Sequence, residues 1–233
     1  MKFINSLIKG KLSKRYKRFF VDIKVNNEVI TAHCPNTGSM KGLLDTNNDV
    51  WISKNDNPNR KLKYTLEIIK VKKNLIGVNT SFANKITYHG LSNNLINEFK
   101  NIKNINSEVF FNKETRFDFL VEKNSQKNFI EVKNVTLFRR DKISEFPDAI
   151  TSRGTKHLKT LVEAIKKGYK SCILFLVQIQ NIEYFKIAKD IDKEYYQNYL
   201  LAKKAGVKFL AYRCKIDPAK EIKIEKKLKI IDE

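Results

Sequence analysis

The chain has 233 residues, of which 42% are hydrophobic, and its 46 lysines and arginines outnumber 25 acidic residues to give a formal net charge of +21. This hydrophobic content excludes a mainly disordered chain, and the length allows one large domain or two small ones. A positive field of this size attracts polyanions, so a nucleic acid is the expected partner. Because the excess is nearly all lysine, a general drift in composition is the alternative explanation.

Membrane, secretory and cysteine signals are also informative. No apolar run approaches the roughly 18 to 20 residues that span a bilayer, and no secretory signal is recognisable at the N-terminus. Three widely separated cysteines make a disulfide framework improbable and, with three histidines, show no zinc spacing. We therefore expect a cytoplasmic protein with no membrane partner and no cysteine-based metal site.

Short strands are predicted first, over residues 19–25, 28–34, 50–54, 62–71 and 75–80, with turn residues between them. Five strands without a helical period predict an OB-like barrel over residues 1–82. Such barrels bind nucleic acid through stacking aromatic side chains, although aromatic residues are more often part of the core. The candidates for stacking are Phe19, Phe20, Trp51 and Tyr64.

The loop PNTGSMKG (35–42) is rich in small polar residues. Exposed N–H groups near Gly38 and the hydroxyls of Thr37 and Ser39 are candidates for holding a phosphate. A structural turn capped by Asn36 is the alternative. Basic residues that precede the first predicted strand complete the nucleic-acid-binding candidates of the barrel, namely Arg15, Lys17 and Arg18.

The pattern changes after residue 80. Leu91, Leu95, Phe99 and Ile102 recur at helical spacing, with Ser92 as a plausible cap. Strands are predicted at 107–111, 116–122, 128–137, 171–179 and 207–214, and helices from about 151 to 168 and over 192–206. This order predicts an α/β (α+β) chain whose second part, residues 83–233, is a mixed sheet flanked by helices.

The stretch FDFLVEKNSQKNFIEVKNVTL (117–137) reads as a hairpin that turns at Asn124 and Ser125. In that register Asp118 faces Glu131 and Arg116 faces Lys133, and alternation places all four side chains on one face of the sheet. The opposite face is expected to join the core through Phe117, Phe119, Val121, Ile130 and Val132.

Two adjacent carboxylates repel each other unless a cation lies between them. Asp118 and Glu131 therefore predict a Mg²⁺ or Mn²⁺ site completed by water and phosphate oxygens. Lys133 would orient or deprotonate a water molecule, or stabilise charge that develops on phosphorus. The alternative is a structural ion-pair ladder across a solvent-facing sheet.

This arrangement resembles the PD-(D/E)XK nuclease superfamily, in which a helix precedes a hairpin that carries Asp on one strand and Glu-x-Lys on the next. Phe117 stands where that motif has proline. The resemblance implies a further acidic metal ligand on the preceding helix. Glu98 is the first candidate for it and Glu108 the second.

The segment FPDAITSRGTKHL (146–158) joins the last hairpin strand to the next predicted helix. Helix N-termini bind phosphate well. Arg153, Lys156 and His157 are therefore candidates for gripping the nucleic acid strand, while Asp148 is expected to brace the loop or cap the helix.

Longer blocks, in order RYKRFFVDI, HCPNTGSMKGLL, GVNT, RFDFL, EVKNVTL, FPDAITSRGTKHL and AGVKFLAYR, resemble the sugar fermentation stimulation protein A (SfsA) family over residues 14 to 216. The resemblance implies an OB-like domain, a nuclease-like domain, non-specific DNA binding and a link to the regulation of sugar metabolism, notably of maltose. Two functions stay open: a DNA-binding protein with a magnesium-dependent phosphodiesterase site, or a non-catalytic DNA-binding regulatory factor. Oligomeric state and cutting polarity stay open as well.

Overall fold

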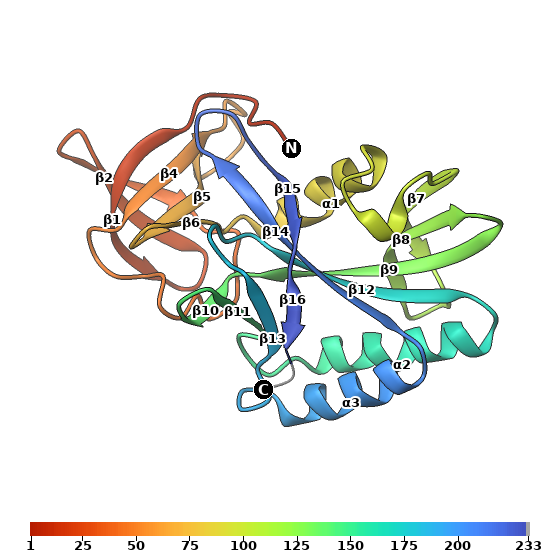
Figure 1. Ribbon diagram of the computed structural model, residues 1–233. Coiled ribbons are helices and arrows are strands. Elements are labelled where there is room, and N and C mark those ends of the chain that lie inside the picture. Colours follow the sequence, from red (N-terminus) through yellow and green to blue (C-terminus); the bar gives the residue numbers. More distant parts are fainter. Residues whose placement is uncertain (232–233) are drawn as a thin grey trace.

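Six strands form the N-terminal part of the computed structural model, which describes residues 1–231. Their sheet order is β3-β2-β1-β4-β5-β6, and β3 also pairs with β5, which closes the first five strands into the predicted barrel (Figure 1). The strands are β1 (Ile8–Tyr16), β2 (Phe20–Val25), β3 (Glu28–His33), β4 (Asp49–Lys54), β5 (Tyr64–Val71) and β6 (Asn74–Gly77).

Strand β1 was not predicted from the sequence. Only Gly10 and Leu12 of its residues are buried, and its basic side chains face outward, so it lacks an apolar run. A Cβ atom at Gly10 would lie 2.6 Å from the Ile23 side chain, so glycine lets β2 approach closely there. Gly10 thus lets β1 fit the barrel, but it also interrupts the apolar alternation by which a strand is predicted.

A second six-stranded sheet, ordered β15-β14-β12-β9-β8-β7, forms the C-terminal part. Parallel pairing of β9, β12 and β14, with antiparallel pairing at both edges, confirms the expected mixed sheet. Helices α2 and α3 cover one face and α1 packs on the other (Figure 1). The elements are β7 (Asn104–Phe110), β8 (Arg116–Lys123), β9 (Gln126–Val135), β12 (Lys170–Val177), β14 (Lys208–Asp217), β15 (Glu221–Lys227), α1 (Ala83–Ser92), α2 (Ser152–Lys166) and α3 (Lys193–Lys204).

The two long helices begin and end as predicted. Thr151 caps α2 by accepting a hydrogen bond from the Gly154 N–H, and Asp192 caps α3 in the same way. Leu158 and Leu161 of α2 are fully buried against the sheet. Cap and apolar stripe are both local signals, which is why the sequence predicted these helices.

The helix predicted around residues 91–102 is wrong. Helix α1 lies earlier and ends at Ser92, and Asn94 then takes a left-handed conformation (φ 56°) that turns the chain. Two single 3-10 turns flank it, η1 (Thr80–Phe82) and η2 (Asn97–Phe99). Leu91 and Phe99 are buried, as their helical spacing predicted, although a turn and not a helix brings them to the core. Leu95, which lies in that turn, is 37% exposed.

A four-stranded sheet, ordered β10-β11-β13-β16, was not predicted. Its strands are only three or four residues long: β10 (Leu137–Arg140), β11 (Ile143–Phe146), β13 (Tyr184–Ile187) and β16 (Lys229–Ile231). In the view of Figure 1, β10 and β11 lie just below the barrel, and β13 and β16 lie nearer the N-terminal ends of α2 and α3.

The barrel and the C-terminal sheet share one apolar core. A single cluster of buried side chains includes barrel residues such as Leu12 and helix and sheet residues such as Leu158 and Phe175. The backbones also join, because the Gly77 N–H donates to the Gln178 carbonyl at 2.8 Å. No helix within residues 1–231 combines the length and apolar character needed to cross a membrane.

Candidate active site

The β8–β9 hairpin has the predicted register. Phe119 pairs with Ile130, and the turn residues 124–125 both have positive φ. The ladder ends at Phe119, because the Asp118 carboxylate accepts the Val132 N–H at 2.7 Å in place of a backbone carbonyl. The two strands therefore separate at Asp118, and this opens space for its side chain.

The predicted division of the hairpin into a charged face and an apolar face is partly wrong. Phe119 and Ile130 do pack in the core on the α1 side of the sheet. Phe117, however, packs with Phe129 on the α2 side, with ring centroids 5.2 Å apart. Because helices cover both faces, Glu131 lies in the interior, only 4% exposed, and not on a solvent-facing sheet.

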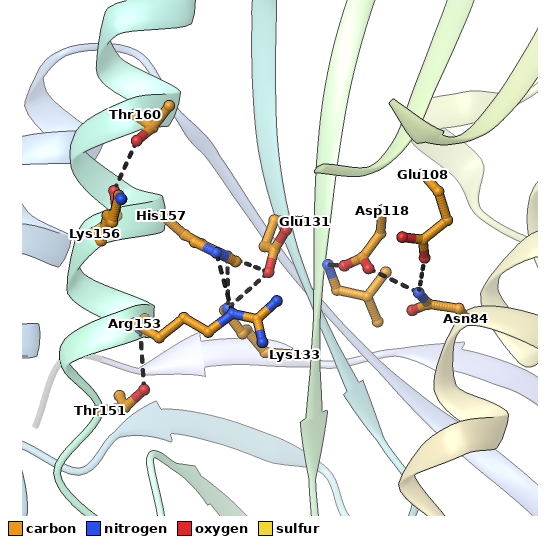
Figure 2. A network of polar contacts seen from close by, with 12 residues as sticks. Asn84, Glu108, Asp118, Glu131, Lys133, Thr151, Arg153, Lys156, His157 and Thr160 are labelled. Atoms are coloured by element: carbon orange, nitrogen blue, oxygen red, sulfur yellow. Dashed lines mark hydrogen bonds and ion pairs between the residues drawn. The ribbon is translucent and has the colours of Figure 1, made fainter. Parts of the chain in front are cut away.

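Glu131 lies between two basic side chains. Lys133 Nζ donates to its Oε1 at 2.8 Å, and His157 Nδ1 of α2 contacts the same oxygen (Figure 2). Burial raises the pKa of Glu131, but the hydrogen bond from His157 and the charge of Lys133 outweigh it, so the pKa lies below its usual value. The carboxylate is therefore ionised, and its buried Oε2 has no hydrogen-bond partner in the described structure.

Asp118 is held from the other side of β9 (Figure 2). Its Oδ1 accepts from Asn84 Nδ2 of α1 at 2.7 Å, and Asn84 also donates to Glu108 of β7 at 3.2 Å. Burial first, and then the negative charge of Glu131, raise the pKa of Asp118 to about 6. The two carboxylates therefore interact unfavourably, as expected for adjacent acids without a cation.

A cavity of about 500 Å³ brings the two acids together. Asp118 and Glu131 both line it, with His157 beside them. The other lining residues are Glu108, Phe110, Glu114, Thr115, Arg116, Arg153 and Lys156.

Helix α2 carries the three residues that the sequence analysis proposed for gripping a nucleic acid strand. Arg153 and Lys156 are exposed and line the cavity, where Lys156 pairs with Glu114 at 2.8 Å. His157 differs from the prediction, because it is buried and turned towards Glu131 and Lys133. It belongs with the acids and does not offer its ring to a strand at the surface.

The structure does not bring Glu98 to this cluster. Glu98 lies in η2, where its carboxylate accepts from the Tyr212 hydroxyl at 2.7 Å and contacts Lys227. The reason is that residues 97–99 form the single turn η2 and not part of the helix predicted around residues 91–102. Glu108, the second candidate, lines the cavity with Asp118.

The loop 35–42 contains the turn capped by Asn36 that was the alternative to a phosphate site. Asn36 is buried and its Oδ1 accepts the Gly38 N–H at 2.8 Å, while the Ser39 N–H donates to Asp148 at 3.2 Å. Arg15 donates to the Asn36 carbonyl at 2.7 Å and to that of Gly38. The Gly38 and Ser39 N–H groups and the Ser39 hydroxyl are therefore in use, whereas Thr37 is exposed. Asp148 adds negative charge that disfavours an anion.

Other barrel candidates remain on the surface. Lys17, Arg18 and Thr37 are exposed, the first two at positive φ in the β1–β2 turn. Phe19 is 45% exposed. The other aromatic candidates, Phe20, Trp51 and Tyr64, are half-buried.

Two site features escaped the sequence analysis. Asn84 lies 34 residues before Asp118, and no spacing rule links a single amide to a distant hairpin. The contact of His157 with Glu131 follows from the way α2 packs on β9. The position of His157 on the buried stripe of α2, one residue before Leu158, was the available signal.

Comparison with known proteins shows the family to which the chain belongs. The family model "SfsA N-terminal OB domain" matches residues 14–78, and "Sugar fermentation stimulation protein RE domain" matches residues 81–220. The chain belongs to the sugar fermentation stimulation protein (SfsA) family. This confirms the resemblance found in the sequence, and the first match agrees with the closed barrel.

Relatives cover the whole chain. A sugar fermentation stimulation protein homolog of Pelagibacter ubique (strain HTCC1062) is 73% identical over 232 residues, 100% of both chains. One from Maricaulis maris (strain MCS10) is 41% identical over 220 residues, 94% of both. A solved structure of SfsA from Pyrococcus furiosus in complex with Ca²⁺ is 22% identical, with a TM-score of 0.88 over 99% of this chain and 98% of that one. The last likeness supports the SfsA fold across the full length.

Proposed function

We propose that this SfsA family member is a DNA-binding phosphodiesterase that uses a divalent metal ion at Asp118 and Glu131. One observation carries the proposal: half-buried Asp118 and buried Glu131 line one cavity, and the Glu131 Oε2 atom has no partner among the described residues. Lys133 lies next to them, because it donates to Glu131 Oε1. A buried, ionised carboxylate oxygen without a partner is costly. A bound cation would remove that cost.

The residues present fit a Mg²⁺ or Mn²⁺ ion that is completed by substrate. Within residues 1–231, no group of three or more His, Cys, Asp or Glu side chains is placed to hold a metal ion. Magnesium commonly binds through one or two carboxylates, with water and phosphate oxygens filling the rest of its shell. When bound, the ion would polarise the phosphate and make water a better nucleophile. The Pyrococcus furiosus relative was solved with Ca²⁺, which also prefers oxygen ligands.

Two residues would assist from α2 and β9. Lys133 is half-buried beside the cavity, so its ammonium would stabilise negative charge that develops on the phosphate. His157 orients Glu131 and keeps it ionised through the contact at Oε1. Glu131 Oε2 is thereby left free for a cation.

Nucleic acid as the substrate is supported by charge. The chain carries +21 overall, and Arg116, Arg153 and Lys156 line the cavity beside the acids. Phosphate groups are the usual partners of such basic side chains.

A second candidate is a non-catalytic DNA-binding regulatory factor. It is favoured by the ion pairs that Glu131 already makes with Lys133 and His157, which a purely structural cluster would also show.

A nuclease assay separates the two functions. Labelled DNA and RNA, single-stranded and duplex, should be cut in Mn²⁺ or Mg²⁺ and left intact in EDTA. Asp118→Asn should lose cleavage, whereas Asp141→Asn, at an exposed ion pair with Lys73, should cut normally. Metal-dependent cutting that survives in Asp118→Asn would contradict the proposal, and absence of cutting on every substrate would favour the regulatory factor.

A further inference from the structure

Asp118 lies where two cavities meet. The first is the cavity of about 500 Å³ that contains Glu131. The second, of about 340 Å³, runs along α1 and is lined by Lys85, Tyr88 and Ser107 among others. Asp118 and Glu108 line both, so the two cavities are neighbours that share the proposed catalytic acid.

An exposed aromatic ring stands in each cavity. Phe110 of β7 is 67% exposed in the first, and the Arg116 guanidinium lies 5.7 Å from its ring centroid. Tyr88 of α1 is 48% exposed in the second, with Phe119 6.5 Å away between ring centroids. Large apolar rings left in water beside a polar site indicate a surface that contacts a ligand.

A third cavity, of about 640 Å³, lies next to the barrel and shares Lys85 of α1 with the second. It is also lined by the N-terminal residues 1–5 and by residues at the ends of β3, β4 and β5. Its volume lies within the range of roughly 300–1,000 Å³ that is usual for ligand sites. Phe82 supplies an aromatic wall, and Lys54 and Arg60 supply positive charge.

The floor of this third cavity is acidic. Glu67 is only 2% exposed and accepts hydrogen bonds from Ser53 at 2.6 Å and Asn79 at 2.8 Å, and burial raises its pKa. A buried acceptor below an aromatic wall and basic groups suits a nucleotide base with an amino group.

We propose that the substrate is a single-stranded polynucleotide whose bases stack on Tyr88 and Phe110 on either side of Asp118, while a further base enters the barrel cavity. This inference rests on the proposed function, because the strand is taken to pass Asp118 as the catalytic acid. Bases within a duplex are already stacked on one another, so a ring must pay to unstack them, whereas unpaired bases stack on it without that cost. The basic residues Lys85, Arg116, Arg153 and Lys156 would follow the phosphates, partly offset by Glu108 and Glu114.

Fluorescence anisotropy tests the proposal in the Lys133→Ala protein, so that cleavage does not disturb binding. The probes are a labelled oligothymidine and a duplex of the same length. The single strand should bind more tightly, and Tyr88→Ala and Phe110→Ala should each weaken it by about tenfold while duplex binding stays within about twofold. Tyr184→Ala, a half-exposed ring in the small sheet, is the matched control and should change neither.

Ring-retaining variants guard against misfolding. Tyr88→Phe and Phe110→Tyr should bind the single strand as the parent does, and all variants should keep its melting temperature within a few degrees. Preference for the duplex, or equal effects of Tyr88→Ala and Tyr184→Ala, would overturn the proposal. If single-strand binding depends on the two rings but the wild-type chain never cuts, the binding proposal stands and the proposed nuclease activity is overturned. Failure of one proposal can therefore be told from failure of the other.

Discussion

At the scale of single residues, the site depends on the contacts of Glu131 and Asp118. One oxygen of Glu131 is shared by Lys133 and His157, and the other has no partner among residues 1–231. Asp118, on the far side of β9, is tied to Asn84 and the Val132 backbone. The two acids that line the cavity are therefore held by different helices, Asp118 by α1 and Glu131 by α2.

Lys133 should matter for cleavage and not for binding. It is a half-buried cation beside the cavity, so Lys133→Ala should lower the rate of cutting by at least about a hundredfold, as loss of a charge-stabilising donor does. Affinity for DNA should stay within a few-fold, since in the proposed function exposed groups such as Arg153 and Lys156 would supply the surface contacts. Single-turnover cleavage and anisotropy on the same preparation measure both.

The control for this change is Lys142→Ala, an exposed lysine paired with Glu183, which should leave both values unchanged. An equal loss of cutting and affinity in Lys133→Ala would mean that Lys133 clamps phosphate and does not assist the reaction.

From the sequence, strand alternation and one turn predicted that Asp118, Glu131 and Lys133 lie close together. The structure brings Asp118 and Glu131 to one cavity, with Lys133 against Glu131, but from different sides of β9. The sequence did not identify Asn84 or the contact of His157 with Glu131. Those contacts depend on how α1 and α2 pack on the sheet, and packing between distant elements leaves no periodic signal. The contact of Asp148 with the loop 35–42 escaped the sequence analysis for a similar reason, since the Ser39 N–H and Asp148 are 109 residues apart.

At the scale of elements, the first turn of α2 sets the position of His157. Thr151 accepts the Gly154 N–H, and a Cβ at Gly154 would lie 2.8 Å from the Thr151 side chain and 3.1 Å from Tyr195 of α3. Glycine thus permits the cap and the α2–α3 contact at once. Helices α2 and α3 were predictable because their caps and apolar stripes are local, whereas β10, β11, β13 and β16 are too short to leave a pattern.

Gly154→Ala should destabilise the protein although alanine favours helix by about 1 kcal/mol. The new methyl group would displace Thr151 and remove the cap, a loss of about 0.5–2 kcal/mol, and would also press on Tyr195. We expect a net loss of about 1 kcal/mol in the free energy of unfolding, measured by urea denaturation. Ser152→Ala, at an exposed position in the same turn, should be nearly neutral. An increase in stability for Gly154→Ala would show that the turn has room to relax.

At the scale of the whole molecule, the barrel and the mixed sheet act as one body. They share a core cluster and backbone hydrogen bonds between β6 and the segment after β12. The barrel cavity, α1 and the acids therefore keep fixed relative positions. The barrel was predictable from turn spacing, but its strand β1 was not, because glycine and outward-facing lysines hide it.

The net charge of +21 makes a prediction at this scale. If the charge serves nucleic acid binding, affinity should fall steeply with salt, by on the order of a hundredfold between about 50 and 200 mM for about four phosphate contacts. Anisotropy titrations at several KCl concentrations measure the slope. A flat dependence would indicate that the lysine excess is compositional.

The central claim is that Asp118 and Glu131 hold a divalent metal ion, and calorimetric titration of Mn²⁺ tests it most directly, since it needs no substrate. We predict saturable binding of one ion to the wild-type chain, weakened at least about tenfold by either Asp118→Asn or Glu131→Gln and unchanged by Asp141→Asn. Binding that is absent from the wild type, or that persists unchanged in both site variants, would contradict the account.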